Sequence, residues 1–257
     1  MIIVGNPFIF GIIIFGIVGS IAPKDTPFVA YVTSPKITSM FAIVEINGCI
    51  LNLAVKNPAI IDDGLADENS YLSAPLKIVY VLKEVNGGTD WSLREYLAAG
   101  GRAQTWNNIA RWTEAIFKID KELPWSYWEK NTGERRNEYL KKIGAVNVKK
   151  TSGGHTSDNK EVYKAAIDNG KILSQQLEWY APDILICCGT GQAFVDACYQ
   201  DSKPRWKRTS RGIPYFVDGK MTVLSFSHPE ARVSPCYLLY ALTDAIREIA
   251  SKISPAV

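Results

Sequence analysis

The sequence predicts an α/β fold with three layers, in which helices cover both faces of a central four-stranded parallel sheet. Four short apolar runs, rich in β-branched residues, are typical of strands buried on both faces. Helical patterns lie between these runs, as crossovers between parallel strands require. Each run also ends in polar residues beside glycine or proline, which indicates that the strands end in loops at one edge of the sheet.

The strand on which this prediction is centred covers residues 78–82, where five apolar residues follow one another without a break. Glu84 and Asn86 come directly after it, and Gly87-Gly88 allows a tight turn or a close approach of the backbone to a ligand. The other three predicted strands cover residues 143–148, 183–188 and 221–226.

The helices are predicted from apolar residues at helical spacing, such as Ile109, Trp112 and Ile116. Thr105 is the expected N-cap of that helix. The predicted helices span residues 91–99, 105–117, 134–142, 157–180 (with Ser157 or Asp158 at the start), 192–199 and 235–252.

Polar side chains therefore follow several predicted strands at the point where each strand ends. The carboxyl ends of parallel strands share one edge of a sheet, and ligands bind there. We expect Glu84, Asn147 and His228 to converge on one cleft at this edge. Each residue also has a purely structural interpretation, since an acidic residue after a strand can cap the next helix and an asparagine can bond the backbone.

The composition is that of a globular protein, with 47% hydrophobic and 21% charged residues among 257. This excludes a disordered chain and fits one large domain or two unequal ones. The five cysteines form no CxxC pair, and there are only two histidines. We therefore predict no metal site, no cofactor and no disulfide framework, which suits a reducing cytoplasm.

The charge is distributed unevenly, which predicts two segments. Residues 1–75 carry a net charge of −3 and contain no arginine, whereas residues 76–257 carry +6. The first segment is predicted to be small and β-rich, because Asn47-Gly48 between apolar runs is typical of a hairpin. The polar, acidic stretch 62–73 is expected to link it to the α/β domain of residues 76–257.

Residues 8–22 form an apolar run that is shorter than the roughly 18 to 20 residues needed to span a bilayer. No lysine or arginine precedes it, so it lacks the basic start of a secretory signal. Its isoleucines and spaced glycines favour bent strands, and we expect no membrane association.

The order of four segments resembles the uracil-DNA glycosylase superfamily across about residues 76–257. These segments are KEVNGG, VNVKKTSGG, PDILICCGT and SFSHPEAR. The sequence departs from the family pattern at Lys83, which replaces a glycine, and at Glu230, which replaces the serine after His-Pro. The cluster-binding cysteines of the thermostable branch are absent. Residues 1–60 also faintly resemble small bacterial toxin-immunity proteins, through GNPFIF and EINGCIL, so a protein partner for residues 1–75 is an alternative.

The resemblance implies a role for each residue of the expected cleft. Glu84 takes the position of the catalytic acidic residue that handles the water, and Asn86 can share that task. Asn147 takes the position of the asparagine that reads the pyrimidine edge. His228 takes the position of the histidine that hydrogen-bonds the departing base. These residue types suit the chemistry, because breaking an N-glycosidic bond leaves positive charge on the sugar and negative charge on the base.

Basic residues around the expected cleft are candidates for contacts with the DNA backbone. The loop of residues 201–212 holds several cations around Trp206, a combination that can bind phosphates and stack on a base, although a solvated loop is an equal alternative. Arg232 is the candidate for filling the gap left by a flipped base, or for a phosphate contact. The full set of predicted DNA-binding residues is Lys149, Lys150, Arg205, Lys207, Arg208, Arg211 and Arg232.

The sequence thus predicts a cytoplasmic hydrolase that removes uracil or another deaminated base from DNA, in single strands or duplexes, as in base excision repair. The alternative is a protein that binds nucleic acid or a nucleotide in the same cleft without catalysis.

Overall fold

The computed structural model describes residues 30–31, 41–46, 49–54, 61–87, 92–154 and 156–253. The chain divides into two compact units, residues 1–60 and 61–257. The predicted apolar run 8–22 lies outside the described residues. None of the helices in the described part is long and apolar enough to cross a membrane.

The first unit contains a three-stranded antiparallel sheet in the order β1-β2-β3. Strands β2 (Phe41–Ile46) and β3 (Cys49–Ala54) pair from Ile46 with Cys49 to Phe41 with Ala54, and β1 (Ala30–Tyr31) pairs with β2. Only two residues connect β2 to β3, which confirms the hairpin that Asn47-Gly48 predicts.

The second unit is an α/β fold around a seven-stranded mixed sheet in the order β4-β6-β5-β7-β10-β9-β8. Its four central strands are parallel and coincide with the four predicted ones. They are β6 (Ile143–Asn147), β5 (Ile78–Leu82), β7 (Ile184–Cys188) and β10 (Met221–Phe226).

The sheet is wider than predicted, because three antiparallel strands extend it at the edges. They are β4 (Gly64–Leu65) beside β6, and β9 (Pro214–Asp218) and β8 (Lys207–Arg208) beyond β10. Strands β4 and β8 have only two residues each, and β9 begins with a proline and ends with two exposed residues, so none has the apolar run of a central strand. The prediction of a purely parallel four-stranded sheet is therefore wrong at both edges.

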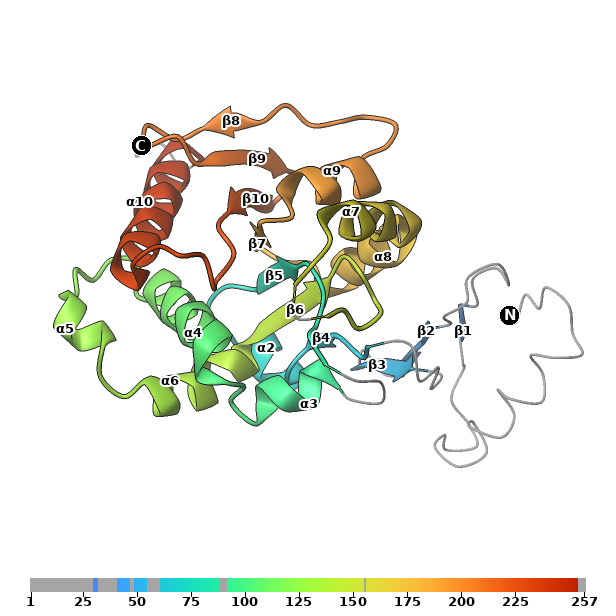
Figure 1. Ribbon diagram of the computed structural model, residues 1–257, viewed down its shortest axis with the longest axis horizontal. Helices are drawn as coiled ribbons and strands as arrows, with labels where there is room; N and C mark the ends of the chain where they lie inside the picture. Colours follow the sequence, from blue (N-terminus) through green and yellow to red (C-terminus); the bar gives the residue numbers. More distant parts are fainter. Residues whose placement is uncertain are drawn as a thin grey trace, which may run out of the picture. The chain divides into compact units, whose positions relative to one another are not determined.

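Helices pack on both faces of this sheet, on opposite sides of the strands in Figure 1. One face is covered by α3 (Leu93–Ala98), α4 (Ala103–Phe117), α5 (Trp125–Trp128), α6 (Thr132–Tyr139) with the 3₁₀ turn η1 (Leu140–Lys142), and α10 (Pro235–Ile253). The other is covered by α2 (Glu68–Leu72), α7 (Asn159–Asp168), α8 (Gly170–Tyr180) and α9 (Gly191–Cys198).

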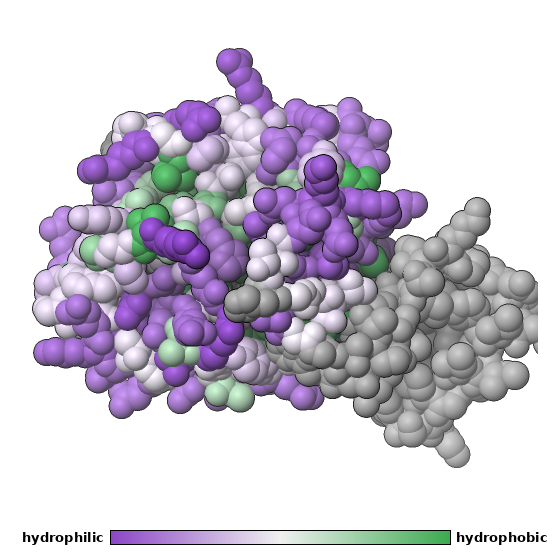
Figure 2. Space-filling view, viewed as in Figure 1, coloured by the Kyte–Doolittle hydropathy of each residue, from purple (hydrophilic) through white to green (hydrophobic). Residues whose placement is uncertain are grey.

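The two faces have separate hydrophobic cores, because successive strand residues point to opposite sides. Along β5, Ile78, Tyr80 and Leu82 join the core under α4 and α10, whereas Val79 and Val81 join the core under α7 and α8. All five residues of β5 are buried, as its unbroken apolar run predicts. On the outside, Figure 2 shows mostly hydrophilic residues with small, separate hydrophobic patches on the face in view.

The expected linker at residues 62–73 is instead part of the second unit. Asp63 is 3% exposed, and its carboxylate accepts hydrogen bonds from the Asn147 backbone N–H at 2.7 Å and from Lys150 Nζ at 2.9 Å. Tyr71 of α2 is fully buried and donates its hydroxyl to the Tyr180 carbonyl at 3.0 Å. The boundary between the two units therefore falls after residue 60 and not after residue 75.

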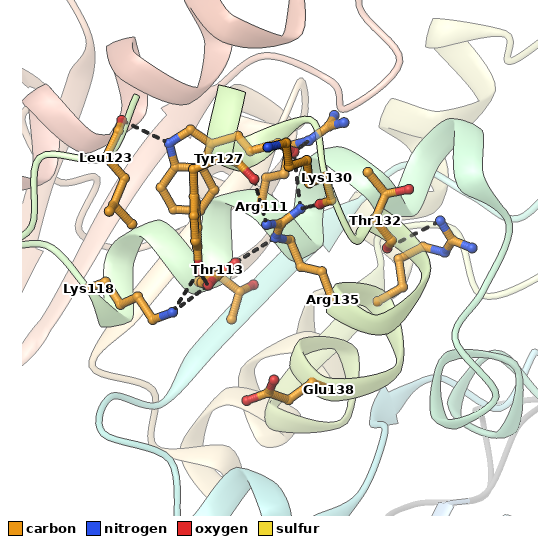
Figure 3. Close-up of polar contacts among 12 residues, drawn as sticks. Arg111, Thr113, Lys118, Leu123, Tyr127, Lys130, Thr132, Arg135 and Glu138 are labelled. Atoms are coloured by element: carbon orange, nitrogen blue, oxygen red, sulfur yellow. Dashed lines mark hydrogen bonds and ion pairs between the residues drawn. The ribbon is translucent and has the colours of Figure 1, made fainter. Parts of the chain in front are cut away.

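A buried ionic cluster holds α4, α5 and α6 together. Arg135 pairs with Glu114 at 2.5 Å and donates to the carbonyls of Trp128 at 3.0 Å and Lys130 at 2.7 Å. Arg111 also donates to the Trp128 carbonyl, at 3.0 Å, so two arginines from different helices share one acceptor. Figure 3 shows the two side chains converging beside Lys130 and Tyr127. This cluster fixes α4, which also contributes residues to the site described next.

Candidate functional site

A cleft of 870 Å³ opens at the carboxyl ends of the parallel strands, as predicted. Glu84 and Asn86 after β5, Asn147 at the end of β6 and His228 after β10 all line it. Four polar residues from three segments that are far apart in sequence thus share one site. Helix α4 and the loop after β10 supply much of the remaining wall, including Arg102, Thr105, Trp106, Asn108, Pro229 and Glu230.

Asn147 lies at the buried end of this cleft, where it is 0% exposed. Its backbone N–H donates to Asp63, which holds the end of β6 in place. Its side-chain oxygen and nitrogen have no hydrogen-bond partner among the described residues. Leaving a buried polar atom unpaired costs about 1 to 3 kcal/mol, so an amide with both atoms free beside a cleft is suited to a polar ligand.

Glu84 is almost fully buried, with a side chain that is 4% exposed. Its Oε2 lies 2.8 Å from Nζ of Lys149, which also lies 3.3 Å from Glu161. The contact with Glu84 is the main reason that the pKa of Lys149 rises above its usual value. Lys149 thus places a cationic partner beside the Glu84 carboxyl group at the edge of the cleft.

Because Gly153 has no side chain, the Glu84 carboxylate can occupy the space beside it. A Cβ atom at position 153 would overlap the Glu84 carboxyl group. The backbone around it is fixed, because the Gly153 N–H donates to the Val85 carbonyl at 2.8 Å and Gly153 forms a β-bridge with Asn86. The glycine in the loop after β6 is thus needed for the position of the carboxylate after β5.

His228 is held in one tautomer by its own loop. Its Nδ1 accepts the backbone N–H of Glu230 at 3.1 Å, so the proton of the neutral ring lies on Nε2. Burial lowers the pKa of His228 below its ordinary value of 6.5; Glu230 opposes this change and Lys83 adds to it. At neutral pH the ring is therefore uncharged, with Nε2–H free to donate.

The loop that carries His228 is attached to α4 by three side chains. Glu230 pairs with Arg102 at 2.7 Å and accepts a short hydrogen bond from the Thr105 hydroxyl. Asn108 donates to the Pro229 carbonyl at 2.7 Å. Burial alone would raise the pKa of Glu230, but Thr105 and Arg102 outweigh it and hold that pKa below its usual value.

These anchoring residues were not predicted from the sequence. Thr105 is not the N-cap of its helix, because α4 begins at Ala103 and its N-cap is Arg102. The one signal available for this contact was the acidic residue Glu230, which follows His228-Pro229. Its partners lie more than 120 residues away in the chain, and no local pattern indicates them.

Lys150 is not available to a DNA backbone, which corrects its predicted role. Its side chain is 3% exposed and pairs with Asp63, and it donates to Gln176 Oε1 at 2.6 Å. Burial lowers its pKa below the usual value, against the effect of Asp63. Lys149, the neighbouring candidate, is occupied by Glu84 and Glu161 and is 16% exposed.

The predicted basic loop lies apart from the cleft. Lys207 and Arg208 form the edge strand β8, two strands beyond β10, and neither residue lines the cleft. Arg205 and Arg211 are also exposed, and Arg211 pairs with Asp244 at 3.2 Å. The loop's aromatic residue, Trp206, is half-buried and packs edge-on against Phe216 with ring centres 4.9 Å apart, so part of its ring is already in contact with the protein.

Arg232 is exposed in the loop after His228. Its neighbours Ala231 and Val233 line the cleft, whereas Arg232 itself does not.

Within the described ranges, no three His, Cys, Asp or Glu side chains gather as ligands of a metal ion would. A scan against protein-family models found no match for this chain, and a search of curated proteins also found none.

Proposed function

We propose that this protein hydrolyses the N-glycosidic bond of uracil or another deaminated base in DNA. The observation that supports this function best is the side chain of Asn147, a buried donor and acceptor with no partner among the described residues, beside a cleft. Uracil presents an acceptor at O4 next to a donor at N3–H, and one amide group can bond both. A base flipped out of the DNA stack would thereby satisfy two buried polar atoms.

Glu84 supplies the charge that the reaction needs on the sugar side. As the bond to the base breaks, positive charge develops on the sugar, and an ionised carboxylate nearby stabilises it. The same carboxylate, or the exposed amide of Asn86, can orient the attacking water. The ion pair with Lys149 holds the Glu84 carboxyl group in position in the cleft.

His228 supplies the hydrogen bond that the departing base needs. The base leaves as an anion, and the Nε2–H of a neutral imidazole can donate to its oxygen. The lowered pKa of His228 means that the ring need not lose a proton before it takes this role. The bonds from Glu230 and Asn108 hold the loop in place, so the donor is positioned before the reaction.

Base release from a single-stranded oligonucleotide containing uracil tests this proposal. The wild type should release uracil, and Asn147→Ala should lower kcat by about 10²- to 10³-fold, as loss of a transition-state hydrogen bond does. Glu84→Gln and His228→Ala should each lower it by roughly 10²- to 10⁴-fold. Asn69→Ala, on the exposed surface of α2, is the matched control and should have wild-type activity.

Oligonucleotides with hypoxanthine or xanthine extend the same assay to other deaminated bases. If the wild type releases none of these bases, the proposal is wrong.

The alternative is a protein that binds a base or nucleotide without cleaving it. The pairing of both cleft carboxylates favours this alternative, because Glu84 and Glu230 already have cationic partners. Such a protein should bind uracil-containing DNA with equal affinity in the wild type and in Glu84→Gln, and release no base in either form.

A further inference from the structure

Exposed aromatic and apolar residues gather beside the mouth of the cleft. Of the six large hydrophobic residues that are most exposed in the described part of the chain, three lie between residues 233 and 240. They are Val233 at 47%, Tyr237 at 70% and Tyr240 at 38% exposed. Single exposed apolar residues are common, but three within eight residues form a patch that water solvates poorly.

The patch is continuous with the cleft. Val233 and Pro235 line the cleft, and Tyr237 follows two residues later in the first turn of α10, about 3 Å further along the helix axis. Side chains on a helix lean toward its N-terminus, so the ring of Tyr237 leans back toward the loop that carries Val233. Nothing among the described residues accepts or donates a hydrogen bond at the Tyr237 hydroxyl.

Tyr240 lies on the same face of α10, three residues after Tyr237. Its hydroxyl donates to the Leu123 carbonyl at 3.2 Å, which holds this second ring in place. Tyr237 and Tyr240 are thus two exposed tyrosines that follow one another along α10 from the end nearer the cleft.

A positive charge accompanies these rings. Arg232 precedes Val233, is exposed, and forms no ion pair with any described residue. Arg102, which lines the cleft, is already paired with Glu230. An unpaired cation next to an aromatic patch at the edge of a cleft complements a phosphate that joins two nucleotides.

We propose that Val233, Tyr237 and Tyr240 form a stacking surface for the bases of single-stranded DNA next to the nucleotide in the cleft, with Arg232 at the intervening phosphate. A single strand fits better than a duplex, because its neighbouring bases can leave their own stack to lie on tyrosine rings. The inference rests on the proposed function, which places a nucleotide of DNA in the cleft. It adds that the DNA is single-stranded and names the surface that selects a single strand.

Binding of a short fluorescent single strand with one central 2′-fluoro-deoxyuridine tests the surface, because the fluorine blocks cleavage of the glycosidic bond. Tyr237→Ala should weaken binding roughly 5- to 100-fold, as loss of one base–aromatic stack does. Tyr237→Phe keeps the ring and should bind like the wild type. Tyr163→Ala removes a tyrosine that is 44% exposed on α7 and bonded to Asp196, and should leave binding unchanged.

Removing one flanking base at a time, by placing an abasic site beside the uridine, locates the stack. In the wild type one abasic position should weaken binding by a factor similar to that of Tyr237→Ala. In Tyr237→Ala the same abasic position should have no further effect, because the partner ring is already gone.

Several results would overturn the inference. The first is that Tyr237→Ala binds the single strand as tightly as the wild type, and the second is that Tyr163→Ala loses as much affinity as Tyr237→Ala. The third is that Tyr237→Ala loses as much affinity for duplex DNA as for the single strand. The last is that the wild type is a dimer and Tyr237→Ala is a monomer. Base release is measured separately: if the wild type binds the strand through Tyr237 but releases no uracil, the stacking surface stands and the proposed function fails. If the wild type releases uracil but neither binding nor release depends on Tyr237, the proposed function stands and the stacking surface fails.

Discussion

The residues of the cleft illustrate what single positions contribute. Glu84, Asn147 and His228 were predicted to meet because each lies at or just after the carboxyl end of a predicted parallel strand, and the topology of such sheets places those ends together. The partners of these residues could not be predicted in the same way. Asp63 contacts Asn147 across 84 positions of sequence, and Thr105 contacts Glu230 across 125.

The protonation state of His228 follows from its surroundings. Burial favours the neutral ring, so we expect its pKa in the folded protein to lie below 6.5 and its Nδ1 to be unprotonated at pH 7. Nitrogen chemical shifts measured through a pH titration check both statements. Glu230→Gln should lower the pKa further, because the variant removes an anion that favours the imidazolium.

The same shift affects stability in a known direction. Between the folded pKa and 6.5, the unfolded chain binds a proton at His228 that the folded chain does not. The free energy of unfolding should therefore fall as the pH falls through this window, and His228→Gln should remove that part of the dependence. A pKa above 6.5 in the folded protein would contradict the assignment.

Gly153 gives a separate test of the Glu84 position. Gly153→Ala should displace the Glu84 carboxylate, because the added Cβ meets the end of a flexible side chain that can move away. We expect little change in the melting temperature but a loss of about 10²-fold in base release, since small misplacements of catalytic groups have such effects. Gly154→Ala, where a Cβ would meet no atom within 4 Å, is the control. Equal activity in both variants would argue against a role for Glu84.

The helices and strands show where periodicity is a good guide and where it fails. The four parallel strands and the β2–β3 hairpin were predicted, because an unbroken apolar run and an Asn-Gly turn are local signals. The single long helix predicted to Tyr180 is instead two helices, α7 and α8, joined at Asn169. Apolar spacing continues through this junction, so the pattern alone cannot show it.

Gly170, the first residue of α8, explains how the two helices fit against α9. A Cβ at this position would overlap the Ala197 carbonyl oxygen, which is backbone and cannot easily move. We expect Gly170→Ala to lower the free energy of unfolding by about 1 to 3 kcal/mol, despite the better helix propensity of alanine. Denaturant unfolding measures this change.

Gly133 is the matched control for that substitution. It lies in α6, and a Cβ added there would meet no atom within 4 Å, so Gly133→Ala should raise the free energy of unfolding by roughly 0.5 to 1 kcal/mol. The opposite signs of the two glycine substitutions separate packing from helix propensity. A stabilising Gly170→Ala would show that α8 and α9 do not pack this closely.

At the scale of the whole molecule, the boundary between the two units sets what can be removed. Residues 61–257 have their own two cores, so deleting residues 1–60 should leave a cooperatively folding protein with an intact cleft. Deleting residues 1–75 should strongly destabilise it, because Lys150 loses Asp63 and the core loses Tyr71. An unpaired buried charge alone costs about 3 to 5 kcal/mol.

Thermal unfolding of the two truncated proteins, followed by circular dichroism, distinguishes these expectations. Equal melting temperatures would mean that residues 61–75 are dispensable, as a linker would be. The acidic character of this stretch suggested a linker, but two of its aspartates bind other residues of the α/β unit. Asp62 accepts the Ser92 hydroxyl at 2.7 Å, and Asp63 is buried with Lys150.

The contacts of residues 61–63 also determine when the cleft can be completed during synthesis. These residues leave the ribosome early, yet their partners are Lys150, whose carbonyl accepts the Ile61 N–H at 2.8 Å, and Gln176, 113 positions after Asp63. His228 is made later still. Contacts between residues this far apart in sequence form slowly and require both partners, so we expect the cleft not to form on a partly synthesised chain. We expect any activity on DNA to appear only when nearly the whole α/β unit has been released and folded.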